Sequence, residues 1–291
     1  MGDFSVNVAV AYQIGAARGD YSILSAMDVG ENELFGALGQ SINELIVQHR
    51  ADLERKRKSR DGASQVDARW LEATSISAGP KARWVDGTPE YSLHICGLQK
   101  LFPQALFIHL FRDVQAVVRS MLNFDRVAGS KLVPNQEEAY RYWIRTVSAC
   151  VMAERAYGPK VVRRVRYSDL IDNPESMMRS LLEFLGEPYT GRCLQPLAQR
   201  INSSNVPADF KTDDEATDPV LVEEATQLSA HLEATPQPAE ASSTTLDEIE
   251  NAFAQRTQYT ATLESQYQRA LQIGRRTGAQ KAPQAPLLGT H

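Results

Sequence analysis

An arginine and a serine follow a long apolar run at a spacing that could bind a phosphate. Arg112 comes directly after the apolar segment 105–111, and Ser120 lies about two helical turns further along the chain. An arginine guanidinium gives planar two-point donation to phosphate oxygens, and a nearby hydroxyl can add another hydrogen bond. The structural alternative is that Arg112 pairs with Asp113 or Asp86, and that Ser120 is only a small helix residue.

The segments around Arg112 predict how it is positioned. The apolar run 105–111 is bounded by turn signals, which predicts a strand buried on both faces of a parallel sheet. A short apolar run at 83–85, a turn at 86–89 and a helical pattern of leucines precede it, and a second apolar-faced helix follows. Strand, helix, strand and helix make a βαβ unit with one more helix. Ligands of such sheets bind beyond the carboxyl ends of the strands, where Arg112 stands.

A further strand is expected at 160–167, where valines alternate with basic residues and Tyr167 stands at the carboxyl end. The arginines of this strand could instead pair with acidic neighbours. Helices are expected over 136–157, with aromatic side chains in the core, and after Asn173, with Gly186 closing the second of them. His109, inside the buried strand, is interpreted as a packing residue and not as a catalytic base.

These segments together resemble the sulfotransferase family, in its bacterial and tyrosylprotein-type branch. The resemblance rests on the turn DGTP at 86–89, on LFPQALFIHLFRD with the helix that ends in Ser120, and on VVRRVRYSDLIDNPESMMRSLLEFLGEPY. It implies transfer of a sulfuryl group from 3′-phosphoadenosine 5′-phosphosulfate. It also implies that Arg112 and Ser120 hold the 3′-phosphate of this donor and that Tyr167 lies at the nucleotide site. The expected fold is α/β, a parallel sheet flanked by helices of the P-loop nucleotide-binding type, with a helical C-terminal extension.

The family's phosphate loop has only a partial counterpart here. Segment 6–14 is interpreted as a strand, because it is apolar and rich in valine. It leads into Gly15, Arg18 and Gly19, which match glycine and arginine positions of the loop, and Arg18 is the predicted phosphate ligand there. The proline, the serine and the threonine pair of the family loop are missing, and Asp20 would repel a phosphosulfate. The segment is therefore a degenerate or deleted loop, or an ordinary turn.

Glu31 is the candidate general base. The resembling branch carries a Gly-Glu pair after its phosphate loop, and Gly30-Glu31 matches that pair. A carboxylate near an acceptor hydroxyl can take the proton that the attacking oxygen loses. The alternative is that Glu31 only favours the positive end of a helix. The family's lysine in the turn at 86–89 is replaced by Gly87, which removes a charge near the transferring group.

Composition limits the classes of partner. The chain has 291 residues, a net charge of −5 and 43% hydrophobic residues, which suits a folded domain without the basic surface that nucleic acids require. Its three cysteines are widely spaced, which fits neither a disulfide framework nor a metal cluster. No run is long enough to span a membrane. A cytoplasmic protein without a metal site is therefore expected.

The expected organisation is a sulfotransferase-like domain over 1–206, a linker and helix over 207–245, a C-terminal helix over 246–278 and a disordered tail over 279–291. The C-terminal helix could pack back on the domain or pair with another chain as a homodimer. The predicted function is sulfuryl transfer to the hydroxyl or amine of a small-molecule, glycan or peptide acceptor. The alternative is a non-catalytic descendant, a nucleotide-binding or protein-interaction module that has lost its phosphate loop. A kinase-like enzyme is disfavoured because no G-x-x-x-x-G-K-[ST] segment is present.

Overall fold

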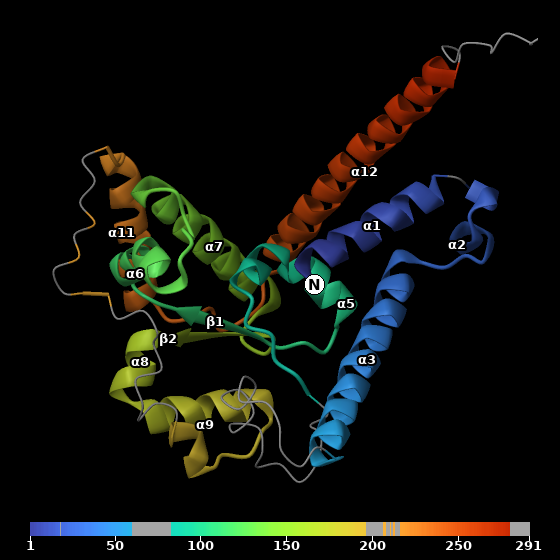
Figure 1. The fold of residues 1–291 in the computed structure, drawn as a ribbon. Helices are drawn as coiled ribbons and strands as arrows, with labels where there is room; N and C mark the ends of the chain where they lie inside the picture. The colour runs from blue at the N-terminus through green and yellow to red at the C-terminus, as the bar shows by residue number, and fades with distance from the viewer. Residues whose placement is uncertain are drawn as a thin grey trace, which may run out of the picture.

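The computed structural model describes residues 1–17, 19–59, 83–195, 206–207, 210, 212 and 216–279 (Figure 1). Its elements in chain order are α1 (Gly2–Ala16), η1 (Gly19–Tyr21), α2 (Ile23–Ala26), α3 (Glu31–Ser59), η2 (Pro89–His94), α5 (Ile95–Leu101), β1 (Phe107–Phe111), α6 (Val114–Ala128), α7 (Gln136–Tyr157), β2 (Val162–Arg166), α8 (Tyr167–Asp172), α9 (Pro174–Leu185), η3 (Gly191–Leu194), α11 (Pro219–Ala234) and α12 (Ser243–Ala279).

The architecture is α/β, with a parallel sheet flanked by helices. The sheet of the described residues consists of β1 and β2, and the register pairs Phe107 with Val162 and Phe111 with Arg166. A parallel pair needs a crossover connection, which α6 and α7 supply. Helices α6, α7 and α11 lie on one side of the sheet, and α8 and α9 lie on the other (Figure 1). The βαβ order that places Arg112 and Tyr167 at neighbouring strand ends is thus confirmed for these two strands.

A single side chain closes the outer edge of β2. Gln237 donates its amide hydrogen to the carbonyl oxygen of Val162 and accepts a hydrogen bond of 2.9 Å from the backbone N–H of Arg164. A carboxamide carries the same donor and acceptor as a peptide group, so it can satisfy a strand edge without a further strand. This contact fixes the segment between α11 and α12 against the sheet.

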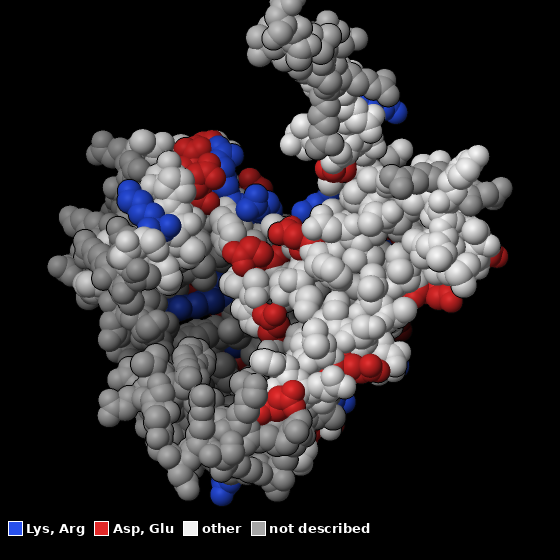
Figure 2. Space-filling view, turned by 45° about the vertical axis from the view of Figure 1, so that its right-hand side comes forward, with Lys and Arg blue, Asp and Glu red and all other residues white. Residues whose placement is uncertain are grey.

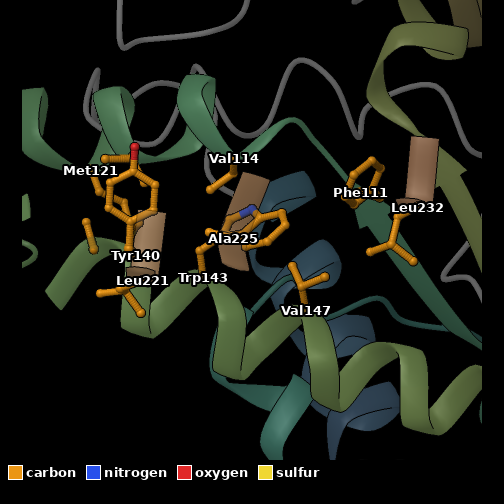
Figure 3. Close-up of a cluster of buried hydrophobic side chains, with 11 residues drawn as sticks. Phe111, Val114, Met121, Tyr140, Trp143, Val147, Leu221, Ala225 and Leu232 are labelled. Atoms are coloured by element: carbon orange, nitrogen blue, oxygen red, sulfur yellow. The ribbon is translucent and has the colours of Figure 1, made fainter. Parts of the chain in front are cut away.

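The main core lies between the sheet and helices α6, α7 and α11. Its buried side chains come from β1, α6, α7 and α11, and Figure 3 shows them converging around Trp143. The predicted core role of the aromatic residues in α7 is confirmed, because Tyr140 and Trp143 are both almost fully buried. Helix α11 contributes Leu221, Ala225 and Leu232 to the same cluster. The segment after residue 206 therefore completes the core of the domain.

Strand β1 is buried on one face only, which corrects the expectation of burial on both faces. Phe111 is 1% exposed and His109 is 6% exposed, whereas Ile108 and Leu110 are 41% and 55% exposed. Helices α8 and α9 pack on that second side against β2. A continuous apolar run does not show which faces will be covered, because that depends on where the neighbouring helices lie.

The N-terminal segment is helical, so the predicted strand over 6–14 is wrong. Helix α1 packs against α12, α5 and η2, and its buried positions include Gly2, Ser5, Val6 and Ala9. This spacing of three and four residues is helical, and tertiary burial outweighs the strand preference of the valines. The run at 83–85 is also not a strand. The sheet of the described residues lacks both predicted strands.

The remaining elements agree closely with the sequence. Helix α3 begins at Glu31, α7 spans the predicted 136–157, and Gly186 ends α9 with a left-handed φ of 66°. The helical C-terminal extension is present as α12, which packs with its first part against α7, α1 and α5. Most of the predicted tail, residues 280–291, lies outside the described residues. Within the described ranges, none of the helices combines the length and apolar character that crossing a membrane requires.

Candidate functional site

The fold brings two of the predicted site residues together at the carboxyl edge of the sheet. Arg112 directly follows β1, and Tyr167 directly follows β2. The guanidinium carbon of Arg112 lies 4.6 Å from the centre of the Tyr167 ring. Such a cation–π contact orients the guanidinium and leaves its N–H groups free to donate at the edges.

The acidic neighbours of Arg112 are engaged elsewhere. Asp113 accepts a hydrogen bond of 3.0 Å from the backbone N–H of Ala116, and thus caps α6. Asp86 accepts hydrogen bonds from Thr88 and Tyr91 at 2.7 Å and 2.8 Å, and the Thr88 contact lowers the pKa of this carboxyl. Within the described ranges, no carboxylate lies within ion-pair distance of Arg112. The structural alternative, in which Asp113 or Asp86 neutralises Arg112, is therefore not what the structure shows.

Ser120 lies on α6, about two turns from its start, and is half-buried. No hydrogen bond within the described ranges joins it to Arg112 or Tyr167. The neighbouring Arg119 donates to the carbonyl oxygen of Pro207 at 3.1 Å, which ties α6 to the chain that leads toward α11. The structure thus places Ser120 on the helix that starts at the site, without a hydrogen bond to Arg112 or Tyr167 among the described residues.

The other arginines of β2 have structural partners. Arg166 donates to the carbonyl oxygen of Thr235 at 3.1 Å and lies 3.6 Å from the carboxylate of Glu233, at the C-terminal end of α11. Cations favour this end of a helix because its last carbonyl groups are unpaired. Arg163 donates to Ser180 of α9 at 2.8 Å. The expectation of pairing with acidic neighbours is confirmed for Arg166, whereas Arg163 pairs with a serine hydroxyl.

Glu31 is not near the Arg112–Tyr167 pair. It is the first residue of α3, and its carboxylate lies 3.8 Å from the ammonium group of Lys100 on α5. Helix α5 precedes β1, so this contact is on the side of the molecule opposite the carboxyl edge of the sheet (Figure 1). The structure therefore separates Glu31 from the candidate phosphate ligands.

The segment that matches the phosphate loop is also remote from Arg112. Gly15 lies in the last turn of α1, and Gly19 begins η1 with a φ of 55°. This end of α1 projects away from the sheet, on the side of α2 (Figure 1). Arg18 lies outside the described residues. The predicted strand-and-loop arrangement does not occur in the described part of the chain, because 6–14 is a helix.

Sequence reasoning did not find a buried charge network behind the site. Glu154 of α7 is completely buried, and its carboxylate contacts His109 of β1 at 2.6 Å and Arg164 of β2 at 2.5 Å. Burial opposes ionisation of Glu154, but the hydrogen bonds and charges of His109 and Arg164 outweigh it and lower the pKa. The inferred packing role of His109 is confirmed. The sequence signal for the partner of His109 was Glu154 itself, because it is a charged residue among the apolar positions of α7.

Figure 2 shows Lys and Arg side chains interspersed with Asp and Glu side chains over the described part of this face. The net charge of −5 provides no bulk positive field, so attraction of an anion depends on local groups such as Arg112. In the described ranges, no group of histidine, cysteine and acidic side chains could hold a metal ion.

Comparison with known proteins places these residues in a family. The family model described as "Sulfotransferase family" matches residues 30–191, more than half of the 291-residue chain. The matched range contains Glu31, Arg112, Ser120 and Tyr167, and it begins after the segment around Gly15.

Two of the curated relatives that match are named as sulfotransferases. The chain is 28% identical to protein-tyrosine sulfotransferase A of Caenorhabditis elegans, over 38% of this chain and 30% of the relative. It is 30% identical to an omega-hydroxy-beta-dihydromenaquinone-9 sulfotransferase of Mycobacterium bovis, over 43% of this chain and 33% of the relative. The matches thus span about a third of the length of these relatives.

Two solved structures also match parts of the chain. The sulfotransferase domain of a Synechococcus olefin synthase matches with 19% identity and a TM-score of 0.35, over 64% of this chain and 62% of that domain. The sulfotransferase domain from the curacin biosynthetic pathway matches with the same identity and TM-score, over 65% and 67%. Because the family model covers more than half of its residues, this chain belongs to the sulfotransferase family.

Proposed function

We propose that this protein transfers a sulfuryl group from 3′-phosphoadenosine 5′-phosphosulfate to a hydroxyl or amine of an acceptor. The observation that carries the proposal is the Arg112–Tyr167 pair, which the fold assembles from two neighbouring strand ends of a sulfotransferase-family chain. This edge is where open α/β sheets bind their ligands. The guanidinium, held by the ring and without a carboxylate partner among the described residues, suits the 3′-phosphate of the donor.

The residues fit the nucleotide end of the donor better than its phosphosulfate end. Arg112 would donate to the 3′-phosphate in two-point geometry, and Tyr167 would hold the guanidinium in that orientation. Ser120 would add a donor from α6, and Arg18 is the remaining candidate ligand at the phosphosulfate. The donor would supply the sulfuryl group. Because α1 occupies segment 6–14, the described residues offer no phosphate loop beside Arg112.

The test of this proposal is a calorimetric titration with 3′-phosphoadenosine 5′-phosphate, which carries the 3′-phosphate but cannot react. Arg112→Ala is expected to weaken binding by at least about tenfold, since a hydrogen bond to a charged group is worth about 1.5–3 kcal/mol. Arg112→Lys should restore only part of the affinity, because an ammonium group lacks the planar donor pair.

A second stacked arginine offers the matched control. The guanidinium carbon of Arg179, on α9, lies 3.7 Å from the centre of the Tyr189 ring, and Arg179 also pairs with Glu175 at the surface. Arg179→Ala should leave nucleotide binding unchanged. Equal losses in both variants would show that Arg112 has no specific role. A wild-type protein that does not bind the nucleotide would refute the enzymatic proposal and favour the non-catalytic descendant.

We further propose Glu31 as the base that accepts the acceptor proton. This proposal rests on the match of Gly30-Glu31 to the Gly-Glu pair of the family and not on proximity, because the structure places Glu31 and Arg112 at opposite ends of the sheet. Glu31→Gln is expected to lower turnover by about a hundredfold while nucleotide affinity stays constant. Turnover would be followed as transfer of radiolabelled sulfate to a tyrosine peptide and to a hydroxylated isoprenoid quinone, the acceptor types named in the relatives.

Glu33→Gln provides the control for this measurement, because Glu33 is exposed in the same helical turn. If both variants turn over as fast as the wild type, Glu31 serves only to pair with Lys100 and to favour the start of α3. We also propose a reducing, cytoplasmic location, since Cys96, Cys150 and Cys193 are all unpaired.

A further inference from the structure

Helix α11 contacts the neighbours of both site residues, although it lies outside the part of the chain that matches the family model. The match ends at residue 191, whereas α11 spans Pro219–Ala234. Two polar side chains of α11, Ser229 and Glu233, are four residues apart, which places them on the same face of the helix, one turn from each other. One of them contacts the residues that follow Arg112, and the other contacts both neighbours of Tyr167.

Ser229 holds the start of α6, directly after Arg112. Its side chain is buried, and its hydroxyl oxygen accepts a hydrogen bond of 3.3 Å from the backbone N–H of Val114. The same hydroxyl donates to a carboxylate oxygen of Asp113 at 3.5 Å. A serine hydroxyl has one donor and two acceptor positions, so it can make both contacts together. The backbone that carries Arg112 is thereby tied to α11.

Glu233 contacts the residues on both sides of Tyr167. Its carboxylate lies 3.6 Å from the guanidinium of Arg166 and accepts a hydrogen bond of 3.2 Å from the hydroxyl of Ser168. The C-terminal end of α11 is also fixed against β2, because Arg166 donates to the carbonyl oxygen of Thr235 at 3.1 Å. Since these two neighbours directly precede and follow the tyrosine, Glu233 restricts how the backbone of Tyr167 can move.

We propose that Ser229 and Glu233 are positioning residues, which together set the 4.6 Å guanidinium–ring contact of the candidate site. Within the described ranges, neither side chain forms a hydrogen bond or ion pair with the two site residues themselves, so both act through the adjoining backbone. The helix is a rigid spacer between the two strand ends, because Leu232 of α11 belongs to the same buried cluster as Phe111 of β1 (Figure 3). The consequence for nucleotide binding rests on the proposed function, whereas the geometry does not.

Fluorine NMR of protein labelled with 3-fluorotyrosine tests the geometry without any nucleotide. The Tyr167 signal is assigned as the one that is missing from Tyr167→Phe. Arg112→Ala then gives the shift of a ring that has lost its guanidinium partner. Ser229→Ala and Glu233→Ala are each expected to move the Tyr167 signal in the same direction, because each releases the backbone next to one member of the pair.

Two exposed positions of α11 provide matched controls. The hydroxyl of Thr226 donates to a backbone carbonyl one turn earlier in the same helix, and Glu224 is exposed. Thr226→Ala and Glu224→Ala should leave the Tyr167 signal unchanged. A signal that moves no further in Ser229→Ala and Glu233→Ala than in these controls would overturn the proposal, whether or not the protein binds a nucleotide. A signal that stays in place in one of the two variants would overturn the role of that residue.

A double-mutant cycle tests the consequence for nucleotide binding. Ser229→Ala and Glu233→Ala are each expected to weaken binding of 3′-phosphoadenosine 5′-phosphate about threefold to tenfold, the range that corresponds to one lost hydrogen bond. In the Arg112→Ala background the same substitutions should have little further effect, because they act through the guanidinium. Glu233→Gln should restore part of the affinity, since its amide oxygen can still accept from Ser168.

The outcomes separate the positioning role from a general structural role and from the proposed function. Equal losses of affinity in the wild-type and Arg112→Ala backgrounds would show that Ser229 and Glu233 only stabilise the domain, and would overturn the positioning role. A wild-type protein that does not bind the nucleotide would refute the proposed function, and the fluorine signal of Tyr167 would then decide the positioning role alone.

Discussion

Replacing Glu154 with glutamine is expected to reduce the free energy of unfolding by about 3–5 kcal/mol, measured by urea denaturation. The carboxylate of Glu154 is completely buried and accepts hydrogen bonds from Arg164, whose side chain is only 6% exposed. Its other contact, to His109, lies on the neighbouring strand. Glutamine keeps the volume but removes the charge, so the guanidinium of Arg164 would stay buried without its counter-ion.

The same helix provides a matched control for this substitution. Glu137 of α7 also pairs with an arginine, Arg141, but both side chains are substantially exposed. Glu137→Gln should change stability by less than about 1 kcal/mol, because water screens surface ion pairs. Similar losses in the two variants would mean that burial of the Glu154 network has no energetic consequence.

The network also predicts an acid dependence of stability. The pKa of Glu154 in the folded protein is held below its ordinary value of 4.5, because His109 and Arg164 together outweigh the effect of burial. The contribution of the carboxylate is therefore complete above pH 4.5 and is lost as the pH falls through the lower, folded-state pKa. The stability difference between wild type and Glu154→Gln should shrink at acid pH. A constant difference would contradict the assignment.

Replacing Gly39 with alanine is expected to destabilise the protein by about 1–3 kcal/mol or more. Gly39 lies where α3 crosses the end of α5, and a Cβ atom there would overlap the carbonyl oxygen of Leu101. Backbone atoms cannot turn away as a flexible side chain can, so the two helices would have to separate. Helix α5 leads directly into β1, and the displacement would therefore reach the strand that carries Arg112.

Gly36 provides the matched control for the substitution of Gly39. It lies one turn earlier on α3, and a Cβ atom at this position would meet no neighbouring atom. Gly36→Ala should raise the free energy of unfolding by about 0.5–1 kcal/mol, because alanine loses less conformational entropy in a helix. Thermal unfolding of both variants would show opposite shifts. A stabilised Gly39→Ala protein would refute the close crossing of α3 and α5.

Both substitutions affect elements that support the candidate site. Glu154 joins β1 to β2 through His109 and Arg164, and these strands end at Arg112 and Tyr167. The register of the strands therefore determines whether the guanidinium reaches the tyrosine ring. We expect the Glu154→Gln variant to bind 3′-phosphoadenosine 5′-phosphate less tightly even where it remains folded. A shift of one strand against the other would move Arg112 away from the Tyr167 ring.

The sequence by itself determined the two strands of the described sheet, most of the helices and the place of the candidate site along the chain. Arg112 and Tyr167 each follow a valine- or leucine-rich run with clear turn signals, and parallel strand ends must meet at one edge of a sheet. Helix boundaries such as those of α7 were equally predictable, because capping residues and helical spacing are local properties. The family resemblance supplied the chemistry that this edge could support.

Only the tertiary structure decided which faces are covered and which distant residues meet. Valines in segment 6–14 suit a strand, yet burial against α12 and α5 makes them helical, because packing outweighs intrinsic preference. The exposure of Ile108 on β1 depends on where α8 and α9 lie. The contacts of Glu154 with His109 and Arg164 depend on how α7 crosses the sheet. Local sequence patterns do not contain these relations, since they arise from contacts between segments far apart in the chain.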